Sequence, residues 1–113
     1  MAPEEFERVV NDAIDRIPEE FAALLNNVAI LIEPDAPPGS PPGLIGLYNG
    51  IPLTEREANP SALPDLIFIY RNPPLALCHT PEEVAEQVYV TVVHEVGHFF
   101  GIEDDELRKL GWG

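Results

Sequence analysis

Apolar residues recur at helical intervals along the first part of the chain, with charged residues between them. Residues 3–27 are therefore predicted to be helical. Pro18 lies inside this stretch and predicts either a kink or the start of a second helix, because proline is tolerated in a first helical turn. The short apolar run at residues 28–32, VAILI, predicts a buried strand.

The middle of the chain lacks helical periodicity. Residues 34–43 hold five prolines and two glycines, which excludes a helix or a central strand and predicts a surface connector. Residues 44–53 predict a hairpin, because Asn49-Gly50 suits a type I′ turn, and residues 54–64 are expected to be a loop. Residues 65–71, DLIFIYR, predict the strongest strand. This strand fits a central position or an edge position, where it would bind a substrate as an added strand.

The last third of the chain predicts a long helix with a defined start and end. Thr80 is a suitable cap, Pro81 fits the first helical position and Glu83 completes a capping box. The helix should continue to about Phe100, where Gly101 allows a left-handed stop. A short helix at about residues 104–110 follows. The order of elements predicts one α+β domain over residues 1–113.

Composition narrows the classes of function. Six basic and twenty acidic residues give a net charge of −14, which argues against binding to nucleic acid or to an anionic membrane. Cys78 is the only cysteine, so no intramolecular disulfide can form. The N-terminus lacks the features of a signal peptide, and no apolar run approaches the roughly 18 residues of a membrane span. We therefore expect a cytoplasmic protein.

Two of the three histidines lie on the predicted long helix, in the sequence HEVGH at residues 94–98. At about 100° per residue, His98 lies about 40° and Glu95 about 100° from His94 around the helix axis, and the apolar residues lie on the opposite side. Both imidazoles can therefore reach one zinc ion, while Glu95 can address a water without being a ligand. The alternative is a core helix with two histidines that are only hydrogen-bonded.

A catalytic zinc site usually has three protein ligands. Gly101 lets the chain turn back towards the metal, and Asp104 follows three residues later as an oxygen ligand. Asp105 and Glu106 are neighbours that could compete for this role. The acidic run also fits a helix N-terminus, where negative charge complements the helix dipole.

The pattern H-E-x-x-H-x-x-G-x-x-D, filled by His94, Glu95, His98, Gly101 and Asp104, resembles the motif of the zincin metallopeptidases. It looks like the elongated metzincin-type motif, with the third-ligand aspartate of snapalysin-type peptidases, and the layout is similar to the small bacterial mini-zincins. The resemblance implies a minimal zincin-like fold, in which a small mixed sheet packs on an N-terminal helix and the motif helix. It also implies a zinc-dependent endopeptidase, with His94, His98 and Asp104 as ligands and Glu95 as base and acid.

The chain departs from the larger zincins in two respects. Met1 is the only methionine, so the methionine turn of metzincins is missing, and the chain ends at Gly113 before a C-terminal subdomain. We therefore expect a peptide or protein substrate, with an oligomer or a partner chain completing the cleft.

Further residues and functions stay open from the sequence. Tyr70, Arg71 and His79 are candidates to stabilise an oxyanion, although each also has an ordinary structural explanation. A non-catalytic metal-binding or partner-dependent module is one alternative function, and a metal-dependent ribonuclease is another. The negative charge disfavours the ribonuclease.

Overall fold

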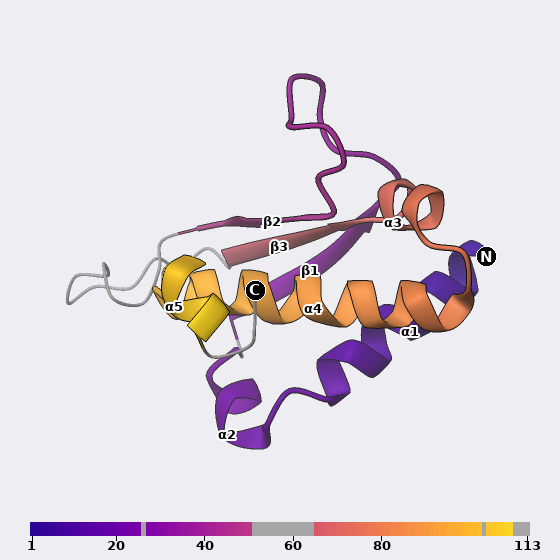
Figure 1. Ribbon diagram of the computed structural model, residues 1–113. Coiled ribbons are helices and arrows are strands. Elements are labelled where there is room, and N and C mark those ends of the chain that lie inside the picture. The colour runs from indigo at the N-terminus through magenta and orange to yellow at the C-terminus, as the bar shows by residue number, and fades with distance from the viewer. Residues whose placement is uncertain (26, 51–64, 103, 110–113) are drawn as a thin grey trace.

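The computed structural model describes residues 1–25, 27–50, 65–102 and 104–109, apart from the side chains of residues 24, 104, 107 and 108 (Figure 1). Its order of helices and strands confirms the α+β class predicted from the sequence. The elements are α1 (Pro3–Asp15), α2 (Glu19–Ala22), the 3-10 helix η1 (Ala23–Leu25), β1 (Val28–Glu33), β2 (Gly46–Asn49), β3 (Asp65–Tyr70), α3 (Asn72–Leu77), α4 (Pro81–Phe99) and α5 (Asp104–Lys109).

The three strands form one mixed sheet in the order β1-β3-β2. β1 pairs in parallel with β3, and β2 pairs antiparallel with β3. The sequence leaves both an edge and a central position open for β3, and the structure places it in the centre. The idea that this strand offers a free edge to a substrate is therefore wrong, and among the described strands β2 lies at an edge instead.

The predicted type I′ hairpin at residues 44–53 is also wrong. Such a turn needs positive φ at both central residues, and neither Asn49 nor Gly50 has it. β2 takes its antiparallel partner from β3, which is distant in the sequence. Residues 51–53, which would form the second half of the hairpin, lie outside the described residues, as does the predicted loop at 54–64.

The N-terminal helical region divides where the sequence places Pro18. α1 ends at Asp15, and Pro18 directly precedes α2, so proline opens a second helix. Strand β1 begins at Val28, as predicted, but its residues are half-buried or exposed, so the expected burial of this strand is wrong. Helix α3 was not expected, because Asn72-Pro73-Pro74 predicts only the end of a strand. Prolines are nevertheless compatible with a first helical turn, and they are the second and third residues of α3.

Helix α4 has the predicted ends. The side chain of Thr80 accepts a hydrogen bond from the Glu83 N–H at 3.1 Å. The carboxylate of Glu83 accepts from the His79 N–H at 3.3 Å, one residue before the partner of an ideal capping box. At the other end, Gly101 has φ of 80° and its N–H donates to the His98 carbonyl. A second bond from Ile102 to Gly97 completes a Schellman motif, which turns the chain sharply after the helix.

The core lies between the sheet, α4 and α1. Figure 1 shows α4 running across one face of the sheet, and α4 contacts α1 as well as β2 and β3. The buried cluster draws on α1 and the turn after it, β3 and α4, and consists of Phe6, Val10, Ala13, Ile17, Ile67, Ile69, Val84, Val88, Val92 and Val96. This packing fixes the helix that carries both histidines against the sheet. None of the described helices is long and apolar enough to cross a membrane.

Candidate metal centre

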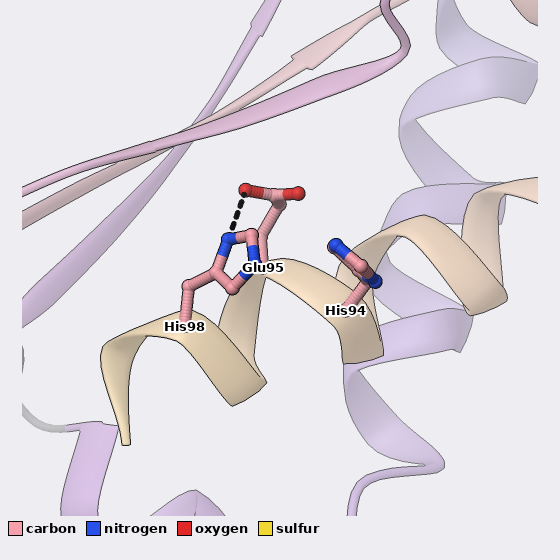
Figure 2. Close-up of side chains that lie close together, drawn as sticks. All are labelled: His94, Glu95 and His98. Atoms are coloured by element: carbon pink, nitrogen blue, oxygen red, sulfur yellow. Dashed lines mark hydrogen bonds and ion pairs between the residues drawn. The ribbon is translucent and has the colours of Figure 1, made fainter. Parts of the chain in front are cut away.

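His94 and His98 lie one helical turn apart on α4, and their side chains come together. Their ring centroids are 4.5 Å apart and the ring planes are inclined at 73°. Both residues are partly exposed. Figure 2 shows the two rings on the same side of the helix, as expected for positions i and i+4.

Glu95 lies between the helix and the sheet and is only 7% exposed. Its Oε1 atom accepts a hydrogen bond from the main-chain N–H of Tyr48 in β2 at 2.9 Å. The same oxygen lies 3.3 Å from Nδ1 of His98, while the other oxygen lies on the side of His94 (Figure 2). Among the described residues, Oε2 has no hydrogen-bond partner. The carboxylate is therefore held through one oxygen and leaves the other for chemistry.

The contact between His98 and Glu95 determines which nitrogen of His98 can bind a metal. If Nδ1 carries the proton, it donates to Oε1 and leaves Nε2 as the metal-binding atom. A carboxylate that accepts from the second nitrogen of a ligating histidine fixes the tautomer and the ring orientation. Glu95 can therefore orient His98 as well as act on a substrate.

Strand β2 approaches α4 closely at Gly46. A Cβ atom at this position would lie 2.6 Å from Cγ2 of Thr91 and 3.3 Å from Cγ of Glu95. A side chain would therefore force the strand away from the helix. The missing side chain of Gly46 brings the main chain of β2 within hydrogen-bonding reach of Glu95.

The three side chains of this group fit a metal ion. One ligand atom each from His94, Glu95 and His98 can be chosen so that all lie within 4.8 Å of one another. Two ligand atoms on a tetrahedral zinc are about 3.3 Å apart, given bond lengths of about 2.0–2.1 Å. The donor atoms therefore lie farther apart than they would around a bound ion, and the imidazoles, which are only partly buried, would have to turn toward it.

A cavity of about 400 Å³ opens beside this group. One wall is the segment that leads into β2, and the other is the face of α4 that carries His94 and Glu95. The lining residues are Pro41, Pro42, Gly43, Leu44, Ile45, Gly46, Gln87, Val90, Thr91, His94 and Glu95. The proline-rich connector therefore forms part of the candidate site, which its sequence does not predict.

Comparison with protein families identifies the family of the chain. The model of one family, described as zincin-like metallopeptidase, matches residues 25–112. The chain belongs to the zincin-like metallopeptidase family. The resemblance inferred from the HExxH pattern is thereby confirmed, and the match extends from η1 across the sheet and the motif helix. A search of curated proteins found no match.

A solved structure shows the same fold as this zincin-like chain. It is a conserved hypothetical protein from Thermo thermophilus, with a TM-score of 0.61 and 23% sequence identity. The alignment covers 97% of each chain. At this identity the similarity establishes the fold alone.

The predicted third ligand of the zincin-like site, Asp104, is the first residue of α5. Its side chain lies outside the described part of the structure, so its role stays a prediction. The Schellman turn at Gly101 places α5 directly after the helix that carries both histidines (Figure 1). The carboxylate found in the metal-binding group is that of Glu95, which the sequence assigns to the base instead.

The three candidates for oxyanion stabilisation do not line the cavity beside His94. His79 lines a separate cavity near the start of α1, together with Cys78. Arg71 precedes α3, where its N–H donates to the Glu33 carbonyl. Tyr70 is 2% exposed, and its pKa is raised by burial first, then by the negative charges of Glu33 and Glu95. Tyr70 is the only one of the three with a described electrostatic link to Glu95.

Sequence reasoning missed Gly46 and Tyr48. The hydrogen bond from Tyr48 to Glu95 spans 47 positions and uses a main-chain donor, which every residue except proline carries. The identity of the residue at position 48 therefore gives no indication of this hydrogen bond. Gly46 does offer a signal, because a glycine inside a strand often indicates close approach of another element.

Proposed function

We propose that this chain is a zinc-dependent metallopeptidase that hydrolyses peptide bonds, with His94, His98 and Asp104 as zinc ligands and Glu95 as general base. The observation that carries the proposal is the position of Glu95 between the two histidines and beside the cavity, in a chain of the zincin-like metallopeptidase family. A carboxylate that only supported a structural metal would not need an open cavity next to it.

Zinc is the metal that suits this set of donors best. Two imidazoles and one carboxylate are a common catalytic zinc set, and they leave one coordination position open. When bound, zinc supplies a Lewis acid that polarises the scissile carbonyl and lowers the pKa of the attacking water to about 7.

Glu95 is placed to move the proton. Oε2 takes a proton from the attacking water as the new C–O bond forms at the scissile carbon. Glu95 then delivers that proton to the amide nitrogen as the C–N bond breaks, so that the amine leaves neutral. Since Oε1 is fixed by the Tyr48 N–H, the carboxylate does not have to reorient between the two transfers.

Strand β2 offers main-chain groups to a peptide. In an antiparallel pair, alternate residues turn their N–H and C=O groups outward. Tyr70 donates to the carbonyl of Ile45, so Gly46 and Tyr48 are the residues of β2 that face the open edge. Because Glu95 occupies the N–H of Tyr48, an extended substrate would pair next to Gly46, along the mainly apolar wall of the cavity.

The decisive experiment compares peptide cleavage by the wild type and by Glu95→Gln, with zinc content measured in both. The variant should retain zinc and lose roughly 10²–10⁴-fold in cleavage rate, as expected for loss of a general base. Glu86→Gln is a matched control, because Glu86 is an exposed glutamate on the same helix and pairs with Arg16 at the surface. It should cleave like the wild type.

Three outcomes contradict the proposal. Unchanged cleavage in Glu95→Gln would show that another group moves the proton. Loss of zinc in the same variant would show that Glu95 is needed to bind the metal, as a ligand or through its contact with His98. If zinc binds but a broad peptide screen detects no chelator-sensitive cleavage by the wild type, the chain is a metal-binding module rather than a peptidase.

A further inference from the structure

Tyr48 makes two hydrogen bonds that point to different parts of the molecule. Its main-chain N–H donates to Oε1 of Glu95 at 2.9 Å, and its phenol donates to Oδ2 of Asp65 at 2.6 Å. One residue of the edge strand therefore connects the candidate base to the first residue of the central strand. The metallopeptidase mechanism does not require the second bond.

The bond between Tyr48 and Asp65 is well suited to fix the edge strand. Asp65 is 5% exposed, and a short hydrogen bond to a carboxylate is stronger than one between neutral groups. In the sheet, Tyr48 lies opposite Ile67, so its phenol reaches two residues back along β3. The bond therefore runs diagonally across the strand pair and resists sliding of β2 along β3.

Two glycines allow β2 to lie this close to its neighbours. Gly46 lies against Thr91 and Glu95, as described above. A Cβ atom on Gly50 would clash with Cγ of Asp65, so the chain after β2 passes directly over this carboxylate. The strand is held at Asp65 on one side of Tyr48 and fits tightly against α4 on the other.

The bond from Tyr48 to Asp65 and the close packing of Gly46 and Gly50 together form a clamp on β2. This clamp has a specific consequence at Glu95. β2 is only four residues long and, among the described strands, pairs with β3 alone. A short edge strand can shift or fray at little cost. The outward N–H of Tyr48 stays aligned with Oε1 only while the strand keeps its position.

We infer that Tyr48 is a positioning residue, whose side-chain bond to Asp65 holds β2 so that its own main-chain N–H orients the carboxylate of Glu95. The phenol acts through the backbone and does not touch the substrate. The catalytic consequence rests on the proposed peptidase function, whereas the hydrogen bond between Tyr48 and Glu95 can be tested without any activity.

The first experiment measures hydrogen exchange of the amide at position 48 by NMR in the full chain supplied with zinc. This amide should be protected in the wild type and should exchange at least about tenfold faster in Glu95→Ala, because its acceptor is lost. Tyr48→Phe should show a similar increase although the acceptor is intact. The amide of Ile69 in the central strand serves as the internal reference, because it points toward β1 rather than β2, and its exchange should not change.

Matched variants separate the hydroxyl from the ring. Tyr48→Phe keeps the ring that contacts Phe99 edge-on at 6.1 Å, so the packing of that ring is retained. Tyr89→Phe removes a hydroxyl from α4 and keeps the ring that stacks on Arg16, so it should leave the amide at position 48 protected. Asp65→Ala removes the acceptor at the other end, and it tests the same bond if Tyr48→Phe does not fold.

The second experiment measures kcat, KM and zinc content with a cleaved peptide. Tyr48→Phe should lower kcat by roughly ten- to a hundredfold, because misplacing a catalytic group has effects of this order. Zinc content should stay within about twofold of the wild type because the ligands have not changed, and KM should rise by less than kcat falls because β2 also contributes Gly46 to the cavity wall. Asp65→Asn keeps an oxygen that accepts a hydrogen bond from the hydroxyl of Tyr48, so this variant should retain most of the wild-type kcat.

The outcomes for the clamp and for the proposed function differ. Unchanged protection of the amide at position 48 in both Tyr48→Phe and Asp65→Ala would overturn the clamp, whatever the activity. Lost protection with an unchanged kcat would overturn its role in positioning Glu95. If the wild type cleaves nothing, the peptidase function fails, and the exchange data still decide whether the clamp exists.

Discussion

Helix α4 and strand β2 form two sides of the same candidate site, but they contribute different things. The helix supplies the side chains that carry chemistry, His94, Glu95 and His98, from within five residues of sequence. The strand supplies a main-chain N–H and the space made by Gly46. Changes in the helix should therefore remove metal or base, whereas changes in the strand should alter geometry and leave the metal bound.

The largest effect is expected on the helix side, from His98→Ala. Removal of one of two imidazoles should reduce zinc from about one ion per chain to near zero and abolish cleavage. Elemental analysis after dialysis, followed by a repeat with zinc added back, measures this directly. His79→Ala is the control, because His79 is exposed and lines a different cavity. Equal zinc content in the wild type and in His98→Ala would show that the zinc does not bind at the proposed site on α4.

Asp104→Ala should have the next largest effect. Loss of a carboxylate ligand should weaken zinc binding by more than the roughly 10–100-fold that is typical when only a supporting residue is lost. Competition with a chelator of known affinity gives the ratio. The neighbouring Asp105→Ala should bind zinc like the wild type. A larger loss of zinc affinity in Asp105→Ala than in Asp104→Ala would show that Asp105 is the third ligand instead.

A smaller effect of another kind is expected on the strand side, from Gly46→Ala. The added methyl group meets Cγ2 of Thr91, so the free energy of unfolding should fall by about 1–3 kcal/mol, as for an overpacked core. Zinc content should stay unchanged while the cleavage rate falls. Chemical denaturation and zinc analysis of the same samples distinguish the two effects.

The Gly46→Ala prediction can be sharpened by a second change in α4. Thr91→Ser removes Cγ2 and keeps the hydroxyl that donates to the Gln87 carbonyl at 2.8 Å. The double variant should recover much of the stability and rate lost in Gly46→Ala. Simple additivity of the two variants would show that this contact does not limit the approach of β2 to α4.

The smallest effect is expected from chelation on the fold itself. The core of α1, α4 and β3 is formed by apolar residues and does not include the histidines, so it does not require an ion. Circular dichroism at about 25 °C should change little on addition of chelator, although the melting temperature should fall if zinc binds the folded state. Unfolding of the chain at this temperature would show instead that the metal is needed to hold the fold together.

The local features of α4 were predictable from the sequence. The Thr80 cap, the Schellman stop at Gly101 and the shared face of His94 and His98 each depend on residues within five or six positions. Such features follow from the fixed geometry of a helix. The break at Pro18 is of the same kind, because proline cannot continue an existing helix.

Pairings between distant segments were not predictable in the same way. Asn49-Gly50 has the composition of a hairpin turn, yet β2 pairs with β3. In this position Gly46 fits against α4 and Tyr48 makes both of its hydrogen bonds. Local propensity is a weak guide when burial and tertiary contacts favour another arrangement. The central position of β3 likewise depends on two neighbours that its own residues do not specify.

By itself, the sequence determined the α+β class, the motif helix and the histidine pair, because these depend on spacing along one element. Only the tertiary structure decided that Glu95 is buried against β2, held by the N–H of Tyr48, and flanked by a cavity with a proline-rich wall. The physical reason lies in the nature of the contacts on the strand side. A main-chain donor and a missing side chain act through position, and position across 47 residues is fixed only when the sheet and the helix pack together.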